Sequence, residues 1–236
     1  CHIDIDTNLV QLMRRLEACR NKEINVFNFV SSWFVYGPDH QYPKENSVCD
    51  PNGFYSITKY AAEKLVKEYC TTFGINYRIL RLGNVYGGPD SGSNKRNALH
   101  YLINQIRQGK DITVYTGISR DFIHILDVCR ALQFLCERGE VNEIYNIGTG
   151  ISTQLSDAVD SAKALLNSEA FITKQSISDE YNQAVDFALD CDKLKSQGFK
   201  PVITFETGLQ DLCLSQKFCT PDPTLMEQKL MQQSPL

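Results

Sequence analysis

The chain has 236 residues, of which 42% are hydrophobic and 22% charged, and its formal net charge at pH 7 is −4. This composition is that of a globular protein and excludes a disordered chain, a collagen-like fibre and a coiled-coil rod. The acidic balance argues against a nucleic-acid partner, and no apolar run reaches the roughly 18 residues that a membrane span needs.

The nine cysteines form neither a disulfide framework nor a metal-binding pattern. Their number is odd, no C-x-x-C occurs, and none has the spacing to histidine that metal sites use. Several occupy apolar positions of helix-like segments, where a free thiol acts as a small hydrophobic side chain. The sequence therefore predicts reduced thiols, a cytoplasmic location and no bound metal.

The first 87 residues predict an alternation of helices and strands. Apolar residues at helical spacing predict helices over residues 6–20 and 55–73, with Asp6 or Thr7 capping the first and Gly74 ending the second. Mostly apolar runs predict strands over residues 24–30 and 75–82. This order is typical of a parallel α/β sheet, which binds ligands in the loops after its strands.

Beyond Gly87 the predicted elements are shorter. The expected helices cover residues 97–109, 126–138, 156–166, 192–197 and 207–216, and the expected strands cover 112–115, 143–147 and 171–177. We therefore expect a sheet domain over residues 1–90, a smaller mixed region over 91–218 that is interleaved with it, and a loose tail over 219–236.

Tyr55 and Lys59 form the first pair that suggests chemistry. They are four residues apart on a predicted helix and so share one face. A neighbouring ammonium lowers a phenol pKa toward neutrality, and a tyrosine so tuned can exchange a proton with a sugar or alcohol hydroxyl. The pattern alone is weak, because a packed tyrosine and a solvated lysine on a surface helix match it equally.

Four other segments give this pair a context. They read SSWFVYG from Ser31, RLGNVYG from Arg81, RDFIHILD from Arg120 and YNIGTG from Tyr145. Their order resembles that of the extended short-chain dehydrogenase/reductase family, in particular its NAD-dependent nucleotide-sugar epimerases and dehydratases of the UDP-glucose 4-epimerase type. The closing stretch LKSQGFKP is similar too, so the resemblance extends to about residue 216. Several weak motifs in one register are jointly specific.

The resemblance implies an NAD site and its catalytic residues. Tyr55 matches the catalytic tyrosine of the family, and Lys59 matches the lysine that holds the nicotinamide ribose and lowers the tyrosine pKa. Ser32 matches the hydroxyl residue that hydrogen-bonds the reacting sugar hydroxyl. Asn8 and Ser31 occupy positions that face the cofactor, and the alternative for Asn8 is an ordinary residue of a helix face.

The resemblance also implies contacts to a nucleotide-diphosphate sugar. Asn84 and Asn97 match residues that touch the sugar nucleotide, and Arg120 matches the arginine that pairs with the diphosphate. Trp33 is expected to line the sugar pocket or to belong to the core, and Tyr115 lies where the family contacts the nucleotide. The structural alternatives are a turn for Asn84, a helix cap for Asn97 and a surface ion pair for Arg120.

The two residues after Ser32 indicate which reaction follows. The 4,6-dehydratases of the family carry Asp-Glu there, whereas this chain has Trp33 and Phe34, which cannot transfer protons. The sequence therefore favours a 4-epimerase-like reaction through a transient keto sugar. The alternatives are an NAD(P)H-dependent keto-sugar reductase, another dehydratase-family enzyme, and a nucleotide-sugar-binding remnant without cofactor.

The glycine-rich G-x-x-G-x-x-G loop with which the family begins is absent from the sequence. We therefore expect a partial Rossmann-like parallel sheet without its N-terminal strands, joined to a smaller α/β substrate-binding domain. We also expect the chain to be a fragment that is inactive or marginal alone, and its choice between NAD and NADP is open. The resemblance implies a homodimer, although a packed core explains the apolar helix faces equally well.

Overall fold

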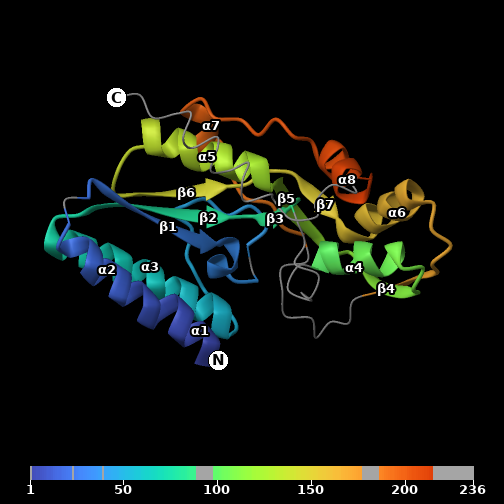
Figure 1. Cartoon of the computed structure of the whole chain (residues 1–236), viewed down its shortest axis with the longest axis horizontal. Helices are drawn as coiled ribbons and strands as arrows, with labels where there is room; N and C mark the ends of the chain where they lie inside the picture. Colours follow the sequence, from blue (N-terminus) through green and yellow to red (C-terminus); the bar gives the residue numbers. More distant parts are fainter. Residues whose placement is uncertain (1, 23, 39, 89–97, 177–185, 215–236) are drawn as a thin grey trace, which may run out of the picture.

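The computed structural model describes residues 2–22, 24–38, 40–88, 98–176 and 186–214. Its main sheet has the order β1-β2-β6, and all three strands are parallel. The strands are β1 (Val26–Ser32), β2 (Asn76–Leu82) and β6 (Glu143–Ile147). Helices α2 (Gln11–Arg20) and α3 (Phe54–Phe73) cover one face and α5 (Ile125–Arg138) covers the other (Figure 1).

The N-terminal helical segment differs from its prediction at the start. α1 (His2–Ile5) and a π-helical turn (Asp6–Val10) precede α2, so Asp6 and Thr7 lie inside the helical segment and cap nothing. The predicted α3 is confirmed, and Gly74 ends it with a φ of 67°. That left-handed conformation suits glycine, which has no Cβ.

All three predicted strands of the main sheet are present, and β1 lies two residues later in the chain than predicted. β6 is confirmed and β2 begins one residue late, whereas β1 runs two residues further than expected and ends at Ser32. Ser31 and Ser32 therefore pair with Arg81 and Leu82 at the carboxyl edge of the sheet. A short 3-10 helix (Trp33–Tyr36) follows directly. The candidate catalytic residue Ser32 is therefore the last residue of β1.

The sheet has a separate hydrophobic core on each face. Leu16 of α2, Val66 of α3 and Ile79 of β2 belong to one core. Leu80 of β2 and Leu135 of α5 belong to the other. Adjacent residues of β2 thus point to opposite faces, as the period of a strand requires, and both faces of this parallel sheet are buried.

The rest of the described chain forms two smaller sheets with helices packed around them. β3 (Asn84–Tyr86), β5 (Ser119–His124) and β7 (Ser152–Gln154) form one sheet, and β4 (Ile112–Thr116) pairs in parallel with β8 (Ile172–Ser176). α4 (Ala98–Arg107), α6 (Leu155–Leu166) and α8 (Phe205–Leu214) pack around them, and α7 (Asp192–Ser196) lies beside β6. Strands β3, β5 and β7 were not predicted, because two have three residues each and β5 is buried on both faces.

These elements confirm an α/β fold with a parallel sheet. β6 comes from the predicted second region but pairs with β2, so the two regions share a sheet, and their boundary stays a prediction. Every cysteine in the described ranges is a free thiol. No helix in the described part of the chain is both long and apolar enough to cross a membrane.

Candidate active site

Three predicted catalytic residues meet where β1 ends and α3 begins. Tyr55 is 43% exposed and Ser32 is buried, and the Ser32 hydroxyl lies close enough to Tyr55 to influence the pKa of its phenol. The Lys59 ammonium donates to the Val30 carbonyl oxygen at 3.0 Å and lies 5.1 Å from the ring centroid of Phe29. An ammonium has three donors, so two donors of Lys59 have no partner within the described ranges and could serve a ligand.

The pKa of Tyr55 differs in direction from the expectation. Partial burial raises it above the ordinary value for tyrosine, the hydrogen bond with Ser32 opposes that rise, and the charge of Asp4 adds to it. Burial also lowers the pKa of Lys59, against the charge of Glu63. Lys59 is not among the groups that shift the Tyr55 pKa in this structure, because its ammonium donates to the strand and desolvation dominates. That Lys59 lowers the Tyr55 pKa stays a prediction.

Asn8 lies in the π-helical turn and fixes one helix to another. Its Nδ2 donates to Thr58 Oγ1 at 3.0 Å, and Thr58 Oγ1 donates to the Tyr55 carbonyl oxygen at 2.9 Å. π-helical turns often occur at functional sites. Asn8 is thus tied to the turn of α3 that carries Tyr55, and its contact with a cofactor stays a prediction.

Ser31 belongs to a buried ion-pair network. Its hydroxyl donates to Glu63 Oε1 at 2.5 Å. Arg81 donates to both oxygens of the Glu63 carboxylate, from Nε at 3.0 Å and Nη2 at 2.7 Å, and both side chains are less than 5% exposed. The network joins β1, α3 and β2, and the role of Ser31 toward a cofactor stays a prediction.

Sequence reasoning missed the part that Glu63 and Arg81 play. Glu63 falls on the buried face of α3, between Ala62 and Val66. A charged residue in the apolar stripe of a helix is the signal that could have found it, because such a residue is almost never buried without a partner.

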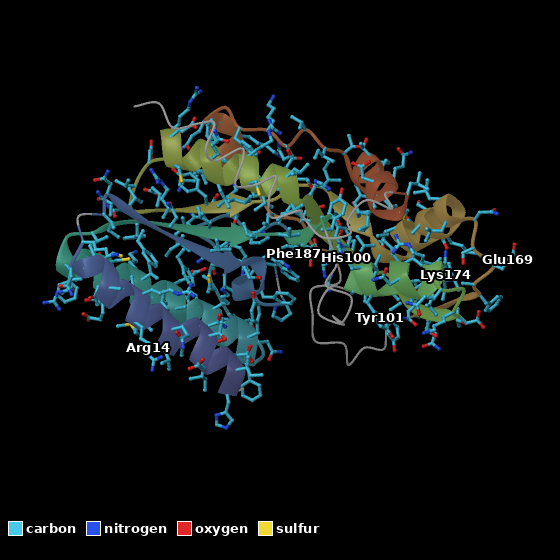
Figure 2. All side chains as sticks on the ribbon, viewed as in Figure 1. Arg14, His100, Tyr101, Glu169, Lys174 and Phe187 are labelled. Atoms are coloured by element: carbon cyan, nitrogen blue, oxygen red, sulfur yellow. The ribbon has the colours of Figure 1, made fainter. Side chains whose placement is uncertain are left out.

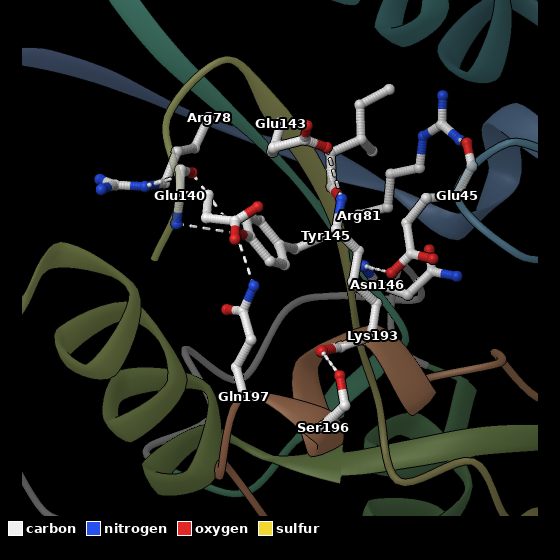
Figure 3. A network of polar contacts seen from close by, with 11 residues as sticks. Glu45, Arg78, Arg81, Glu140, Glu143, Tyr145, Asn146, Lys193, Ser196 and Gln197 are labelled. Atoms are coloured by element: carbon white, nitrogen blue, oxygen red, sulfur yellow. Dashed lines mark hydrogen bonds and ion pairs between the residues drawn. The ribbon is translucent and has the colours of Figure 1, made fainter. Parts of the chain in front are cut away.

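The loop after β1 is fixed by a second network, which Figure 3 shows in part. The Tyr36 hydroxyl donates to Asn146 Oδ1 at 2.6 Å, and the backbone N–H of Asn146 donates to Glu45 Oε1 at 2.9 Å. Asn146 Nδ2 donates to the carbonyl oxygens of Pro43 and Asp190. Two of the sequence motifs thus supply structural residues that hold the loop against β6.

An aromatic cluster stands beside Tyr55. The Trp33 ring stacks on Phe34 and lies tilted against Phe187, with centroid distances of 4.1 Å each, and the Phe34 and Tyr55 rings meet edge to face at 6.1 Å. The guanidinium carbon of Arg120 lies 5.3 Å from the Trp33 ring centroid. Phe187 lies near the middle of the molecule (Figure 2). Trp33 is buried, so it is both a core residue and a neighbour of the site.

Asn84 has an unsatisfied donor. Its Nδ2 is buried and has no hydrogen-bond partner among the described residues. A buried donor without a partner costs about 1–3 kcal/mol, so an acceptor oxygen of a ligand would stabilise it. Tyr115 is 44% exposed on β4, in a different sheet from Ser32, and Asn97 lies outside the described residues.

Asp121 is a fully buried carboxylate that sequence reasoning left unassigned. It accepts hydrogen bonds from the backbone N–H groups of Thr149, Gly150 and Leu189 and from the Thr149 hydroxyl, at 2.6 to 3.1 Å. A Cβ on Gly148 would collide with this carboxylate, which explains the glycine in YNIGTG. Asp121 thereby holds the segment that carries Phe187 near Trp33.

Comparison with known proteins shows the family. The model of the NAD dependent epimerase/dehydratase family matches residues 3–148. The chain is 30% identical over 213 residues to a putative UDP-glucose 4-epimerase of Methanocaldococcus jannaschii, which covers 88% of this chain and 68% of that protein. It is also 30% identical over 176 residues to a dTDP-D-glucose 4,6-dehydratase of Dictyostelium discoideum, covering 69% of this chain and 39% of that protein.

Solved structures agree with this result. UDP-glucuronic acid 4-epimerase from Bacillus cereus, determined with UDP-glucuronic acid and NAD, superposes with a TM-score of 0.78 at 26% identity, covering 87% of this chain and 66% of that one. The chain therefore belongs to the NAD dependent epimerase/dehydratase family of enzymes. This confirms the family resemblance and the Rossmann-like α/β fold, and the chain spans about two thirds or less of the length of these relatives.

Proposed function

We propose that the polypeptide carrying this chain is an NAD-dependent 4-epimerase of a nucleotide-diphosphate sugar. The observation that carries this proposal is the place of Tyr55, with Ser32 nearby, beside a cluster of aromatic side chains that begins with Phe34 and Trp33. Trp33 and Phe34 stand where an eliminating enzyme needs acid and base groups, and they offer no proton to transfer. The UDP-sugars in the names of the relatives make them the first substrates to test.

The residues present fit the nicotinamide end of the cofactor. Tyr55 is accessible, and two ammonium donors of Lys59 have no partner among the described residues. When bound, NAD supplies an acceptor for hydride from the sugar carbon. We assign to Tyr55 the transfer of the proton of the sugar hydroxyl and to Ser32 the hydrogen bond that orients the two oxygens.

Arg120 and Asn84 are the proposed substrate contacts. A guanidinium suits the planar, bidentate recognition of a phosphate, and the orphan donor of Asn84 needs an acceptor. Arg120 also lies over Trp33, which packs on Phe34, the neighbour of Tyr55. A diphosphate bound to Arg120 would therefore lie close to the aromatic cluster beside Tyr55. Tyr115 and Asn97 stay proposals from the resemblance alone.

A product assay tests the proposal. The polypeptide is incubated with NAD and either UDP-glucose or UDP-glucuronic acid, and the products are separated by chromatography and identified by NMR. We expect the 4-epimer to form with no net consumption of NAD. A 4-keto-6-deoxy sugar would instead show a dehydratase, net oxidation of NADPH with a keto sugar would show a reductase, and binding without turnover would show a binding protein.

We also propose a homodimer formed through the helices that precede and follow β1. Ile3 of α1 and Ile57 and Leu65 of α3 are large apolar side chains that remain 69%, 51% and 36% exposed. α1 and α2 both contact α3. Exposed apolar side chains on packed helices are typical of a surface that another protein covers.

A further inference from the structure

A cavity of about 460 Å³ is lined in part by the segment that joins α7 to α8. Figure 1 shows the course of that segment. None of the proposed catalytic or substrate-binding residues lines it. Its size is in the range of small-molecule sites, which are typically about 300–1,000 Å³. The lining residues that matter below are Phe122, Ile151, Lys195, Lys200, Val202 and Glu206.

Two lysines that line this cavity have no side-chain partner among the residues that the structure describes. Lys195 and Lys200 make no side-chain hydrogen bond or ion pair with any residue in the described ranges. Lys193, on the same short helix as Lys195, by contrast donates to Glu143 at 2.6 Å. A Cβ on Gly150 would lie 2.9 Å from Lys195 Nζ, so this ammonium sits against the wall next to Thr149.

The charge balance of the cavity is positive. Glu206 is the single carboxylate among its described lining residues, and it too has no ion pair within the described part of the chain. The charged side chains that line the cavity therefore sum to a net charge of +1. Charge-assisted hydrogen bonds to a carboxylate or phosphate are the contacts that would use both ammonium groups.

The remaining walls are mostly apolar, with three threonines among them, and are partly open to water. Ile151 and Val202 are 65% and 64% exposed, and Phe122 and Phe205 also line the cavity. Branched apolar side chains at the mouth of a cavity gain free energy when an apolar group covers them. The same cavity thus offers a hydrophobic surface and two lysine ammonium groups that no described residue pairs with.

We propose that this cavity binds a small amphipathic anion, with an apolar body against Ile151 and Val202 and a carboxylate or phosphate group on Lys195 and Lys200. The inference goes beyond the proposed epimerase activity and does not depend on it. A carboxylate and a phosphate would both accept charge-assisted hydrogen bonds from the lysines. The probes below separate the contribution of this charge from that of the apolar contact.

The test uses phenyl phosphate as the probe and the 236-residue chain labelled at isoleucine and valine methyl groups. Two control probes each keep one feature of phenyl phosphate. Inorganic phosphate has the charge without the ring, and benzyl alcohol has the ring without the charge. We expect phenyl phosphate to shift the Ile151 and Val202 methyl signals saturably and to bind at least about tenfold more tightly than either control probe.

Substitutions assign the charge. Lys195→Ala with Lys200→Ala should weaken phenyl phosphate binding by about tenfold or more. Lys110→Ala, at an exposed lysine outside the cavity, should leave it unchanged. Methyl signals elsewhere report whether the double variant folds, and the single Lys200→Ala variant, at an exposed position, carries the test if it does not.

Three results would overturn the proposal. Equal shifts with inorganic phosphate would show a nonspecific charge effect, and binding that survives the lysine substitutions would show that the cations are not used. Displacement of phenyl phosphate by uridine diphosphate would place the probe in the nucleotide-sugar site instead. Because the readout is binding, failure of the epimerase assay leaves this test unaffected.

Discussion

Arg120 is a buried cation whose guanidinium lies over the Trp33 ring, and its Nη1 donates to the Ser119 carbonyl oxygen at 2.7 Å. Both neighbours hold the planar group in one orientation, which is what recognition of a diphosphate requires. Lysine keeps the charge but loses the flat fork of donors, so the two residues are not equivalent at such a position.

Arg120→Lys should therefore raise the KM for a nucleotide sugar by about tenfold and change kcat much less. Steady-state kinetics of the polypeptide that carries this chain measure both constants. Arg14→Lys, at an exposed position of α2 that points away from the sheet (Figure 2), is the control. An unchanged KM for Arg120→Lys would remove the diphosphate contact from the account.

Asp186 gives a prediction on pH. Hydrogen bonds from Ser119, and also from Ser152, lower the pKa of its carboxyl below the ordinary 3.8. A depressed folded-state pKa means that the charged carboxylate stabilises the fold above the unfolded pKa and that this contribution is lost as the pH falls through the folded pKa.

Asp186→Asn should accordingly lower the free energy of unfolding at neutral pH, and the difference from the parent should shrink as the pH falls below about 4. Urea unfolding at a series of pH values measures it. A difference that stays constant across this range would mean that the two hydroxyls do not favour the charged form.

At the scale of the element, the ion pair of Glu63 and Arg81 joins α3 to β2, and the Ser31 hydroxyl ties β1 to the same carboxylate. These contacts fix α3 against β1 and β2. Because Tyr55 lies on α3, they also help to position its side chain. In a buried ion pair the attraction between the two charges offsets much of the free energy lost on burying them. Removing one partner destabilises the protein strongly, because the other charge then stays buried without compensation.

Glu63→Leu should lower the free energy of unfolding by about 3–5 kcal/mol, since it leaves the Arg81 guanidinium buried without a carboxylate. Adding Arg81→Met to that variant should restore most of the loss. Denaturant unfolding of both variants measures the effect. If the single and double variants were equally unstable, the cost would come from packing and not from the unpaired charge.

How far the sequence predicts these elements depends on their periodicity. α3 and β6 have clear patterns and clear ends, such as Gly74, and both are confirmed. β5 carries six buried residues in succession and includes Arg120 and Asp121, so its composition does not resemble a strand. Its residues could be recognised only as a motif, which explains why Asp121 was missed as a structural centre.

At the scale of the whole molecule, the chain crosses between the two predicted regions and returns to add β6 to the main sheet. The order of the motifs was enough to predict which residues gather: Ser32, Tyr55 and Lys59 lie together, and Trp33 connects them to Arg120. It could not predict the direction of the Tyr55 pKa, because that depends on burial and on where the Lys59 ammonium points.

The proposed dimer is a prediction at this scale. Light scattering coupled to size-exclusion chromatography should give twice the mass of one chain, and Ile57→Glu should give the mass of one, because a charge on that face opposes its burial. Val48→Glu, at an exposed apolar residue of the loop after β1, should leave the mass unchanged. A single-chain mass for the parent would show that the apolar faces of α1 and α3 serve another purpose.

The central claim is that Tyr55 moves the proton of the sugar hydroxyl, and Tyr55→Phe tests it most directly. The substitution removes one oxygen from a partly exposed side chain, so the fold and the nucleotide-sugar contacts should persist. We predict a fall in kcat of about 100-fold or more, with the dissociation constant for the nucleotide sugar changed by less than about twofold. A variant that binds as before and turns over at the parent rate would contradict the account.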